Sequence, residues 1–243
     1  MKKSRIILLL SIILFSSCDE LFNEDNDFFL TEETIVEGLK EALVIGADSA
    51  SNQLSLTDGY YGNELIKILL PPEADIIVEN IEYIPGGDEL IEKIILGINR
   101  SAEDAAKEVT PIFVSAITNM SIIDGITILN GENDAATSYL KSNTYSELYD
   151  LYQPKLESSL DKKLVGSVST NSLWYTLVDQ YNSIANTLVG KLAGLQPVET
   201  QLDSYITNKA LDGLFLKIAE EESAIRTDPV ARVTDLLEEV FGN

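Results

Sequence analysis

The chain has 243 residues, of which 40 are acidic and 17 basic, with no histidine and one cysteine. A formal charge of −23 excludes nucleic acid and anionic membrane surfaces as electrostatic partners, because both carry dense negative charge. The absence of histidine removes the commonest general base, the commonest zinc ligand and every Ser-His or Cys-His pair. With 45% apolar residues, the chain is still long enough to bury a sizeable core.

The N-terminal segment reads as an export signal. Residues 1–17 have a basic start, an apolar run from Ile6 to Phe15 and two small residues directly before Cys18. This arrangement resembles a bacterial lipobox, in which the cysteine is acylated and becomes the mature N-terminus; an ordinary signal peptide with a nearby cysteine is the alternative. We expect a lipoprotein signal peptide over 1–17, and lipidated Cys18 with an acidic tether over 18–30. The mature chain would then carry 14 basic against 40 acidic residues, a charge of −26.

Residues 31–243 show helical periodicity and essentially no strand-period runs. We therefore expect one all-α domain of about nine or ten helices. Thr31 is placed to cap a first helix that ends near Ser55. A loop over 57–63 follows, and its two glycines, two tyrosines, aspartate and asparagine make it the most site-like loop in the chain. After it come an extended piece over 66–70, a short helix over about 72–83, and a longer helix over 88–109 on which Asn99 lies at the rim of the apolar face.

The middle of the chain predicts several further helices. They begin at Thr110-Pro111, at a cap on Ser121 (ending at Asn130-Gly131), at Asp134, at Thr144 (continuing past Leu160) and at a cap on Thr170. The tyrosines in the helix from Thr144 are read as a packing stripe between helices. The segment 186–201, which contains two glycines and Pro197, is either a loop or a poorly capped helix.

The C-terminal segment 207–242 predicts two amphipathic helices with a restart at Asp228-Pro229. On the first, Glu222 projects into the middle of an apolar stripe, and a buried carboxylate needs a partner. We expect it to pair with Arg226, Arg232 or Arg100 and to fix helix packing; a catalytic acid of raised pKa or a metal ligand is the alternative. The last helix should bury a set of apolar residues: Val233, Leu236, Leu237, Val240 and Phe241.

Four stretches together resemble a known family. They are TDGYYGN (57–63), NRSAEDAAKEVTPIFVSAITNMS (99–121), ILNGENDAATSYL (128–140) and KALDGLFLKIAEEESAIRTDPVARVTDLLEEVFG (209–242). In this order they resemble the bacterial family called domain of unknown function 4197. The resemblance implies an all-helical exported or lipid-anchored protein of bacteria with a two-membrane envelope, and it implies no activity.

Three hypotheses for function follow. The first is a non-catalytic, lipid-anchored envelope module, in the outer membrane, that binds another envelope protein through an exposed groove. The second is a carboxylate-based site that binds a divalent cation or hydrolyses glycan at a cluster of Asp58, Asp212 and Glu222. The third is a carrier of an apolar ligand within the bundle. No catalytic, nucleotide-binding or calcium-loop motif is present, so the sequence assigns no catalytic residue, metal or cofactor. The candidate binding residues are Asp58, Tyr60, Asn63, Asn99, Arg100, Asp212, Glu222 and Arg226.

Overall fold

A computed structural model describes residues 30–242 of the chain, so the predicted signal peptide, Cys18 and nearly all of the acidic tether lie outside the described residues. The described residues form ten α-helices and three short 3₁₀ helices, with no strand beyond an isolated bridge between Val165 and Val168. The prediction of an all-α domain is confirmed. Within this part of the chain, no helix combines the length and apolar character needed to cross a membrane.

The helices follow one another along the chain with few long loops. The α-helices are α1 (Glu32–Leu54), α2 (Asp75–Glu79), α3 (Gly87–Ala106), α4 (Val109–Asn119), α5 (Gly125–Leu129), α6 (Ala135–Leu160), α7 (Thr170–Ala185), α8 (Leu188–Leu192), α9 (Asp203–Thr227) and α10 (Asp235–Phe241). The 3₁₀ helices are η1 (Pro72–Ala74), η2 (Ile81–Tyr83) and η3 (Pro229–Ala231).

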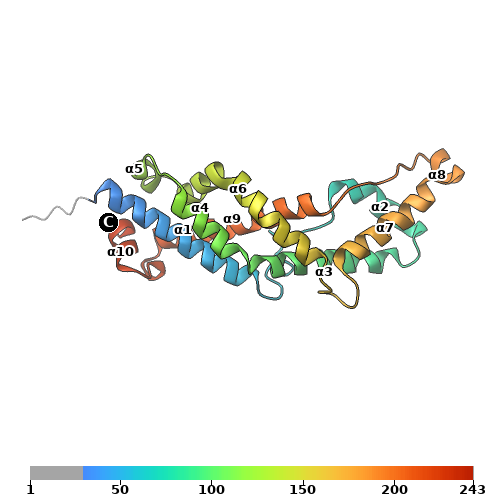
Figure 1. The fold of residues 1–243 in the computed structure, drawn as a ribbon, viewed down its shortest axis with the longest axis horizontal. Coiled ribbons are helices and arrows are strands. Elements are labelled where there is room, and N and C mark those ends of the chain that lie inside the picture. The colour runs from blue at the N-terminus through green and yellow to red at the C-terminus, as the bar shows by residue number, and fades with distance from the viewer. Residues whose placement is uncertain (1–29, 243) are drawn as a thin grey trace, which may run out of the picture.

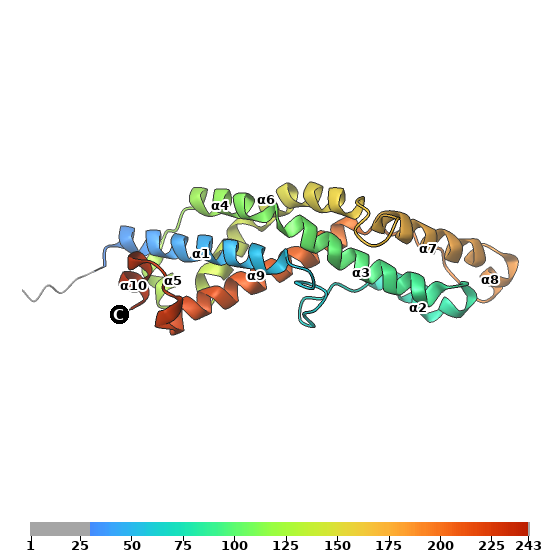
Figure 2. The same ribbon diagram turned by 90° about the horizontal axis from the view of Figure 1, so that it is seen from below.

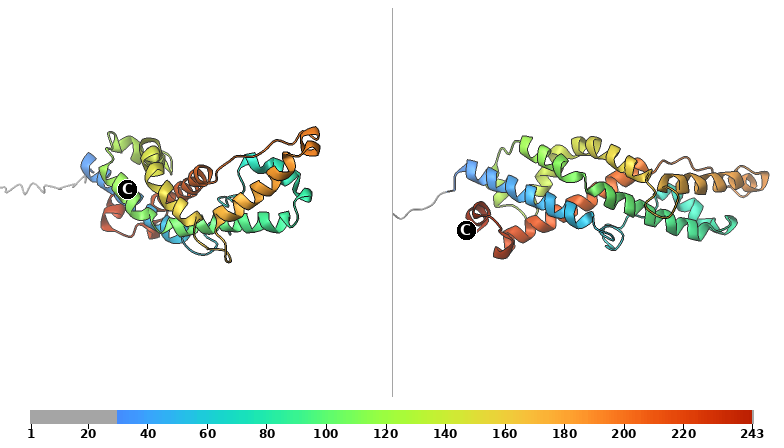
Figure 3. Two further views of the ribbon diagram at one scale, coloured as in Figure 1. Left: turned by 45° about the vertical axis from the view of Figure 1, so that its right-hand side comes forward. Right: turned by 60° about the horizontal axis from the view of Figure 1, so that its bottom comes forward.

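The molecule is elongated and has two regions (Figure 1). In the first, called the bundle, α9 packs between α1 and α6, with α4 against both of those helices and the short α5 and α10 at one end. In the second, called the arm, α7 lies along α3, and the short α2 and α8 lie toward the tip (Figure 2). The two views of Figure 3 show the arm projecting from the bundle, to which α3 and α6 connect it.

Helix α1 illustrates why the bundle packs closely. Thr31 accepts a hydrogen bond from the Thr34 N–H as its N-cap, and Ser55 follows its last residue, as predicted. Small residues recur on its buried face, and a Cβ at Gly46 would lie 3.2 Å from the Ile218 side chain of α9. The backbones of α1 and α9 can therefore approach closely, which increases the apolar area removed from water along the contact.

Several predicted helix boundaries are wrong. The helices expected from Asp134 and from Thr144 are one continuous helix, α6, because the Thr144 hydroxyl donates to the Leu140 carbonyl within the helix instead of capping a new one. Asp124, not Ser121, caps α5 through the Thr127 N–H. The uncertain segment contains α8, capped by Thr187, followed by an irregular stretch.

The restart at Asp228-Pro229 is also shorter than expected. Asp228 accepts from the Val230 N–H, but the result is only the 3₁₀ turn η3, and α10 begins seven residues later with Thr234 as its cap. Val233 precedes that helix and is 68% exposed, so the prediction that it is buried is wrong. Leu237, Val240 and Phe241 are buried as predicted.

Candidate functional site

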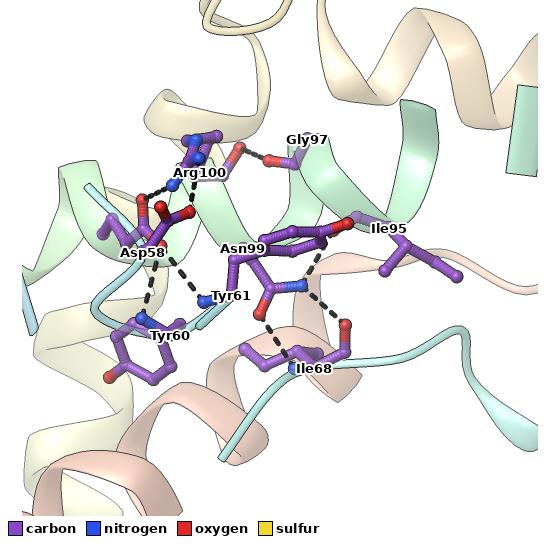
Figure 4. A network of polar contacts seen from close by, with 10 residues as sticks. Asp58, Tyr60, Tyr61, Ile68, Ile95, Gly97, Asn99 and Arg100 are labelled. Carbon is purple, nitrogen blue, oxygen red and sulfur yellow. Dashed lines mark hydrogen bonds and ion pairs between the residues drawn. The ribbon is translucent and has the colours of Figure 1, made fainter. Parts of the chain in front are cut away.

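The predicted site loop, residues 57–63, is held against α3 by charged groups (Figure 4). Arg100 donates to Asp58 Oδ1 at 2.7 Å and to Glu103 Oε2 at 2.5 Å. Glu103 is nearly buried, and its other oxygen accepts the backbone N–H groups of Tyr60 and Tyr61 at 3.2 Å each. We call these five residues the loop network. Asp58 has a positive φ of 68°, which is uncommon for a residue other than glycine, and its side chain pairs with Arg100.

Asn99 holds the next segment of the chain. Its amide donates to the Ile68 carbonyl at 2.7 Å and its amide oxygen accepts the Ile68 N–H at 2.9 Å, so the side chain pairs with Ile68 as a neighbouring strand would (Figure 4). Asn99 was expected at the rim of the apolar face, but it is completely buried. Asn99 can be buried because both the oxygen and the nitrogen of its amide have hydrogen-bond partners, which offset the free-energy cost of removing the amide from water.

Tyr60 connects the loop to α9. Its hydroxyl donates to the Ala210 carbonyl at 2.8 Å, and the whole side chain is buried. A Cβ at Gly213 would lie 2.7 Å from the Tyr60 ring, so the ring can pack here only because residue 213 has no side chain. Asn63 ends the loop: its side-chain oxygen accepts the Leu65 N–H, and its carbonyl accepts from Ile66 and Lys67.

Burial and neighbouring charges shift the pKa of two residues of the loop network, Tyr60 and Arg100. Burial raises the pKa of Tyr60 well above its ordinary value, and the nearby Tyr152 and Glu103 raise it further. For Arg100, burial works to lower the pKa, but the hydrogen bonds that its guanidinium donates to Glu103 and Asp58 outweigh burial, and the pKa is raised. Tyr60 therefore stays neutral and Arg100 stays charged at every physiological pH, which suits a fixed structural connection better than proton transfer.

An open groove runs beside these residues along α9. Its first section encloses about 480 Å³ between residues 65–69, α6 and α9. Two further sections continue it along α9. The middle one shares Lys141, Asp212 and Leu216 with the first, and the last shares Asp134, Leu216 and Ala219 with the middle one. We call this continuous surface the α9 groove. Segment 65–69, which Asn99 and Asn63 hold, forms one wall of it.

Three lysines line the first section of the α9 groove. Lys141 pairs with Asp212 at 2.9 Å. The ammonium of Lys67 lies 4.2 Å from the centroid of the Tyr61 ring, and that of Lys209 lies 5.9 Å from the centroid of the Tyr205 ring. Among the described residues, neither Lys67 nor Lys209 has a carboxylate within salt-bridge distance, although acidic residues outnumber basic ones throughout the chain.

Glu222 and Arg226 form a buried pair at the other end of α9. The Arg226 Nε and Nη2 atoms both lie 2.8 Å from Glu222 Oε1. The same carboxylate accepts the backbone N–H groups of Ala136 and Thr137 at the start of α6, together with the Thr137 hydroxyl. Arg226 also donates to the Ile128 and Leu129 carbonyls at the end of α5.

This pair therefore caps two helices at once. A carboxylate lies at the positive N-terminal end of α6 and a guanidinium lies at the negative C-terminal end of α5, which are the favourable positions for each charge. Asp134, at the N-cap position of α6, makes no side-chain cap, and Glu222 takes over that role from α9. The expectation that Glu222 pairs with an arginine and fixes packing is confirmed: of Arg226, Arg232 and Arg100, the partner is Arg226, and both carboxylate oxygens have donors.

The eight predicted residues thus fall into three places. Five belong to the loop and its supports, which are Asp58, Tyr60, Asn63, Asn99 and Arg100; Asp212 lies in the α9 groove, and Glu222 and Arg226 form the buried pair. The predicted cluster of Asp58, Asp212 and Glu222 is not found, because each pairs with a different cation, and positions 212 and 222 are about 15 Å apart along α9. No group of three or more metal-ligating side chains occurs within residues 30–242.

Sequence reasoning missed four residues that shape this region. Glu103 is central to the loop network, and its position three residues after Arg100 on a helix was the available signal. Lys67, Lys141 and Lys209 line the groove, but they come from three separate segments and no spacing along the chain brings them together.

The fold and the site together define an all-helical protein whose polar residues hold helices and loops in place around an open groove. The chain belongs to the family described as protein of unknown function (DUF4197), whose model matches residues 29–242, as the resemblance predicted. Neither a curated protein nor a solved structure matches the chain.

Proposed function

We propose that this protein is a non-catalytic binding module of the bacterial cell envelope, anchored in the outer membrane by lipid on Cys18. The anchor is supported by the basic start, the apolar run and the small residues before the only cysteine of the chain. The matched family region begins at residue 29, so this segment precedes it in the way that a signal and tether would.

The observation that carries the binding role is the division of the polar residues. The carboxylates proposed for chemistry are held in fixed pairs, and those in the loop network and the buried pair connect elements of the fold. The α9 groove, in contrast, is open to solvent and presents apolar side chains together with Lys67 and Lys209, which have no ion-pair partner among the described residues. Fixed supports behind an open surface suit recognition of a partner.

The anchor is tested by labelling cells with a radioactive fatty acid and separating membrane from soluble fractions. The wild-type chain should incorporate label and remain with the outer membrane. Cys18→Ser should lose both, because no other thiol exists in the chain. A wild-type protein that is exported but carries no label would contradict the lipid anchor.

The divalent-cation alternative is tested by thermal unfolding of the wild type and of Glu222→Gln with and without millimolar Ca²⁺, Mg²⁺, Mn²⁺ and Zn²⁺. An ion present at about 100 times its dissociation constant would stabilise the fold by about 2.7 kcal/mol. We expect no such stabilisation of the wild-type chain by any of the four ions. If an ion stabilises the wild-type chain and Glu222→Gln abolishes that stabilisation, the carboxylate-site hypothesis would be supported instead.

A further inference from the structure

The α9 groove is unusual in its charge. Its first section contains three lysines and one carboxylate, within a chain of formal charge −23. Its last section contains Glu132, Asp134 and Glu220, and of these only Glu220 has a cationic partner, Lys217, among the residues described. One end of the groove is therefore locally positive and the other end is negative.

The surface between the two ends is open and mixed: apolar residues of α9 lie beside the Lys141–Asp212 pair and the polar side chains of Thr137 and Ser138. Leu216 lines all three sections of the groove and is 36% exposed, and Leu65 and Leu69 border the positive end with 80% and 55% exposure. Gly213 and Ala219 line it from the same helix and carry little or no side chain. Such a surface accepts a narrow ligand lying along α9, with an aliphatic group over Leu216.

The length of the groove limits the ligand. From Lys209 to Ser223 the helix rises by about 21 Å, at 1.5 Å per residue. An extended peptide covers that distance with about six residues, at roughly 3.3 Å each.

The charge of the whole molecule limits the ligand further. A long polyanion would be repelled by the acidic surface, and a polycation would be attracted to many places on it. A short segment with an acidic end, a basic end and no net charge avoids both effects, since at physiological salt its charges interact mainly within about 8 Å. An anionic lipid would satisfy the lysines but would leave its acyl chains beside the carboxylates of the other end.

We propose that the α9 groove binds an extended peptide segment of about six residues from another envelope protein. The segment carries acidic side chains at the end that meets Lys67 and Lys209, an aliphatic residue over Leu216, and basic side chains at the end that meets Glu132 and Asp134. This inference deepens the proposed binding role and rests on it.

The test is selection of a display library of random seven-residue peptides on the full chain, purified in a nonionic detergent. Enriched peptides should carry Asp or Glu at one end, Lys or Arg at the other, and an aliphatic residue between them. Their binding should weaken at least tenfold in Lys67→Glu/Lys209→Glu and in Glu132→Lys/Asp134→Lys. Lys209 is exposed on α9, so Lys209→Ala alone should weaken binding about threefold without any effect on folding.

Matched controls separate the groove from the overall charge. Lys163→Glu/Lys191→Glu and Glu82→Lys/Glu92→Lys change the net charge by the same amounts at exposed positions outside the groove, and they should leave binding within twofold of the wild type. Equal weakening in the controls, or no enrichment of peptides with opposite charges at their ends, would overturn the proposal. Preferential binding of phosphatidylglycerol vesicles, lost in Lys67→Glu/Lys209→Glu, would assign the groove to lipid and also overturn it. Because the assay uses purified protein, its outcome is independent of whether Cys18 is acylated in cells.

Discussion

The two ends of α9 use charge in opposite ways. Near its C-terminus, Glu222 and Arg226 are removed from water and every oxygen of the carboxylate has a donor. Nearer its N-terminus, Lys209 and Asp212 are in contact with solvent, and Lys209 has only an aromatic ring beside it. In this acidic protein, an ionisable residue that is buried with its partners has a structural role, whereas one that is exposed and has few partners remains available to a ligand.

Substitution of the buried carboxylate should give the largest effect. Glu222→Gln leaves Arg226 buried without its counter-ion and weakens the cap of α6, so we expect a loss of about 3 kcal/mol in the free energy of unfolding. For a domain of this size that lowers the Tm by roughly 6–12 °C. Thermal unfolding checks it, with the neighbouring exposed Glu220→Gln as a control that should change stability by less than about 0.5 kcal/mol. Equal losses in the two variants would show that burial does not distinguish them.

Crowding the contact between the loop and α9 should give the next largest effect. Gly213→Ala places a methyl group 2.7 Å from the Tyr60 ring, so we expect a loss of about 2 kcal/mol, with displacement of the loop. Urea unfolding of a double-mutant cycle with Tyr60→Leu measures the coupling. If the added methyl group clashes with the ring, Gly213→Ala should lower the free energy of unfolding much less in the Tyr60→Leu background. An equal loss in both backgrounds would show that the strain lies elsewhere.

A partly buried carboxylate should show an intermediate effect on stability that depends on pH. Asp104 on α3 accepts from Lys162 and Ser159 near the end of α6 and from Lys107. Burial works to raise its pKa, but the hydrogen bonds of Lys162, Ser159 and Lys107 outweigh burial and hold the pKa below its ordinary value of 3.8.

The lowered pKa of Asp104 determines how its contribution to stability depends on pH. Because the folded carboxylate keeps its charge to a lower pH than the unfolded one, its stabilisation is present above about pH 4 and is lost as the pH falls through the folded pKa. Asp104→Asn should therefore be less stable than wild type at pH 7, by up to about 1 kcal/mol, and the two should converge toward pH 2–3. Urea unfolding between pH 7 and 2.5 measures this; a difference that grows on acidification would contradict the assignment.

The smallest effect on stability is expected in the groove itself. The Lys141–Asp212 pair is about half exposed on both sides, so Asp212→Asn should change the free energy of unfolding by less than about 0.5 kcal/mol. The same substitution removes the only carboxylate of the positive end and should strengthen binding of the acidic-ended peptides severalfold. Fluorescence anisotropy at low and high salt checks this, since an electrostatic gain should disappear in high salt.

Local patterns were enough to predict most of the fold. Residue spacing predicted the apolar stripe of α9 and the burial of Glu222, and it limited the partner of Glu222 to Arg226, Arg232 or Arg100, of which the structure has Arg226. The patterns failed where two local signals compete: Thr144 has the residue type of an N-cap but bonds back within α6, and Asp228-Pro229 supports only one turn. The α9 groove could not be predicted, because its lysines come from the segment after α1, from α6 and from α9, and only tertiary packing brings them together.

Helix α1 gives the molecule a fixed reach. Its 23 residues extend about 35 Å, from the end where the N-terminal side of the chain enters to the loop that leads into the groove wall (Figure 1). That distance is about the thickness of the hydrocarbon core of a bilayer. If the chain is attached to a membrane through its N-terminal side and α1 points away from that surface, the helix is a spacer of fixed length that holds the groove beyond the lipid headgroups.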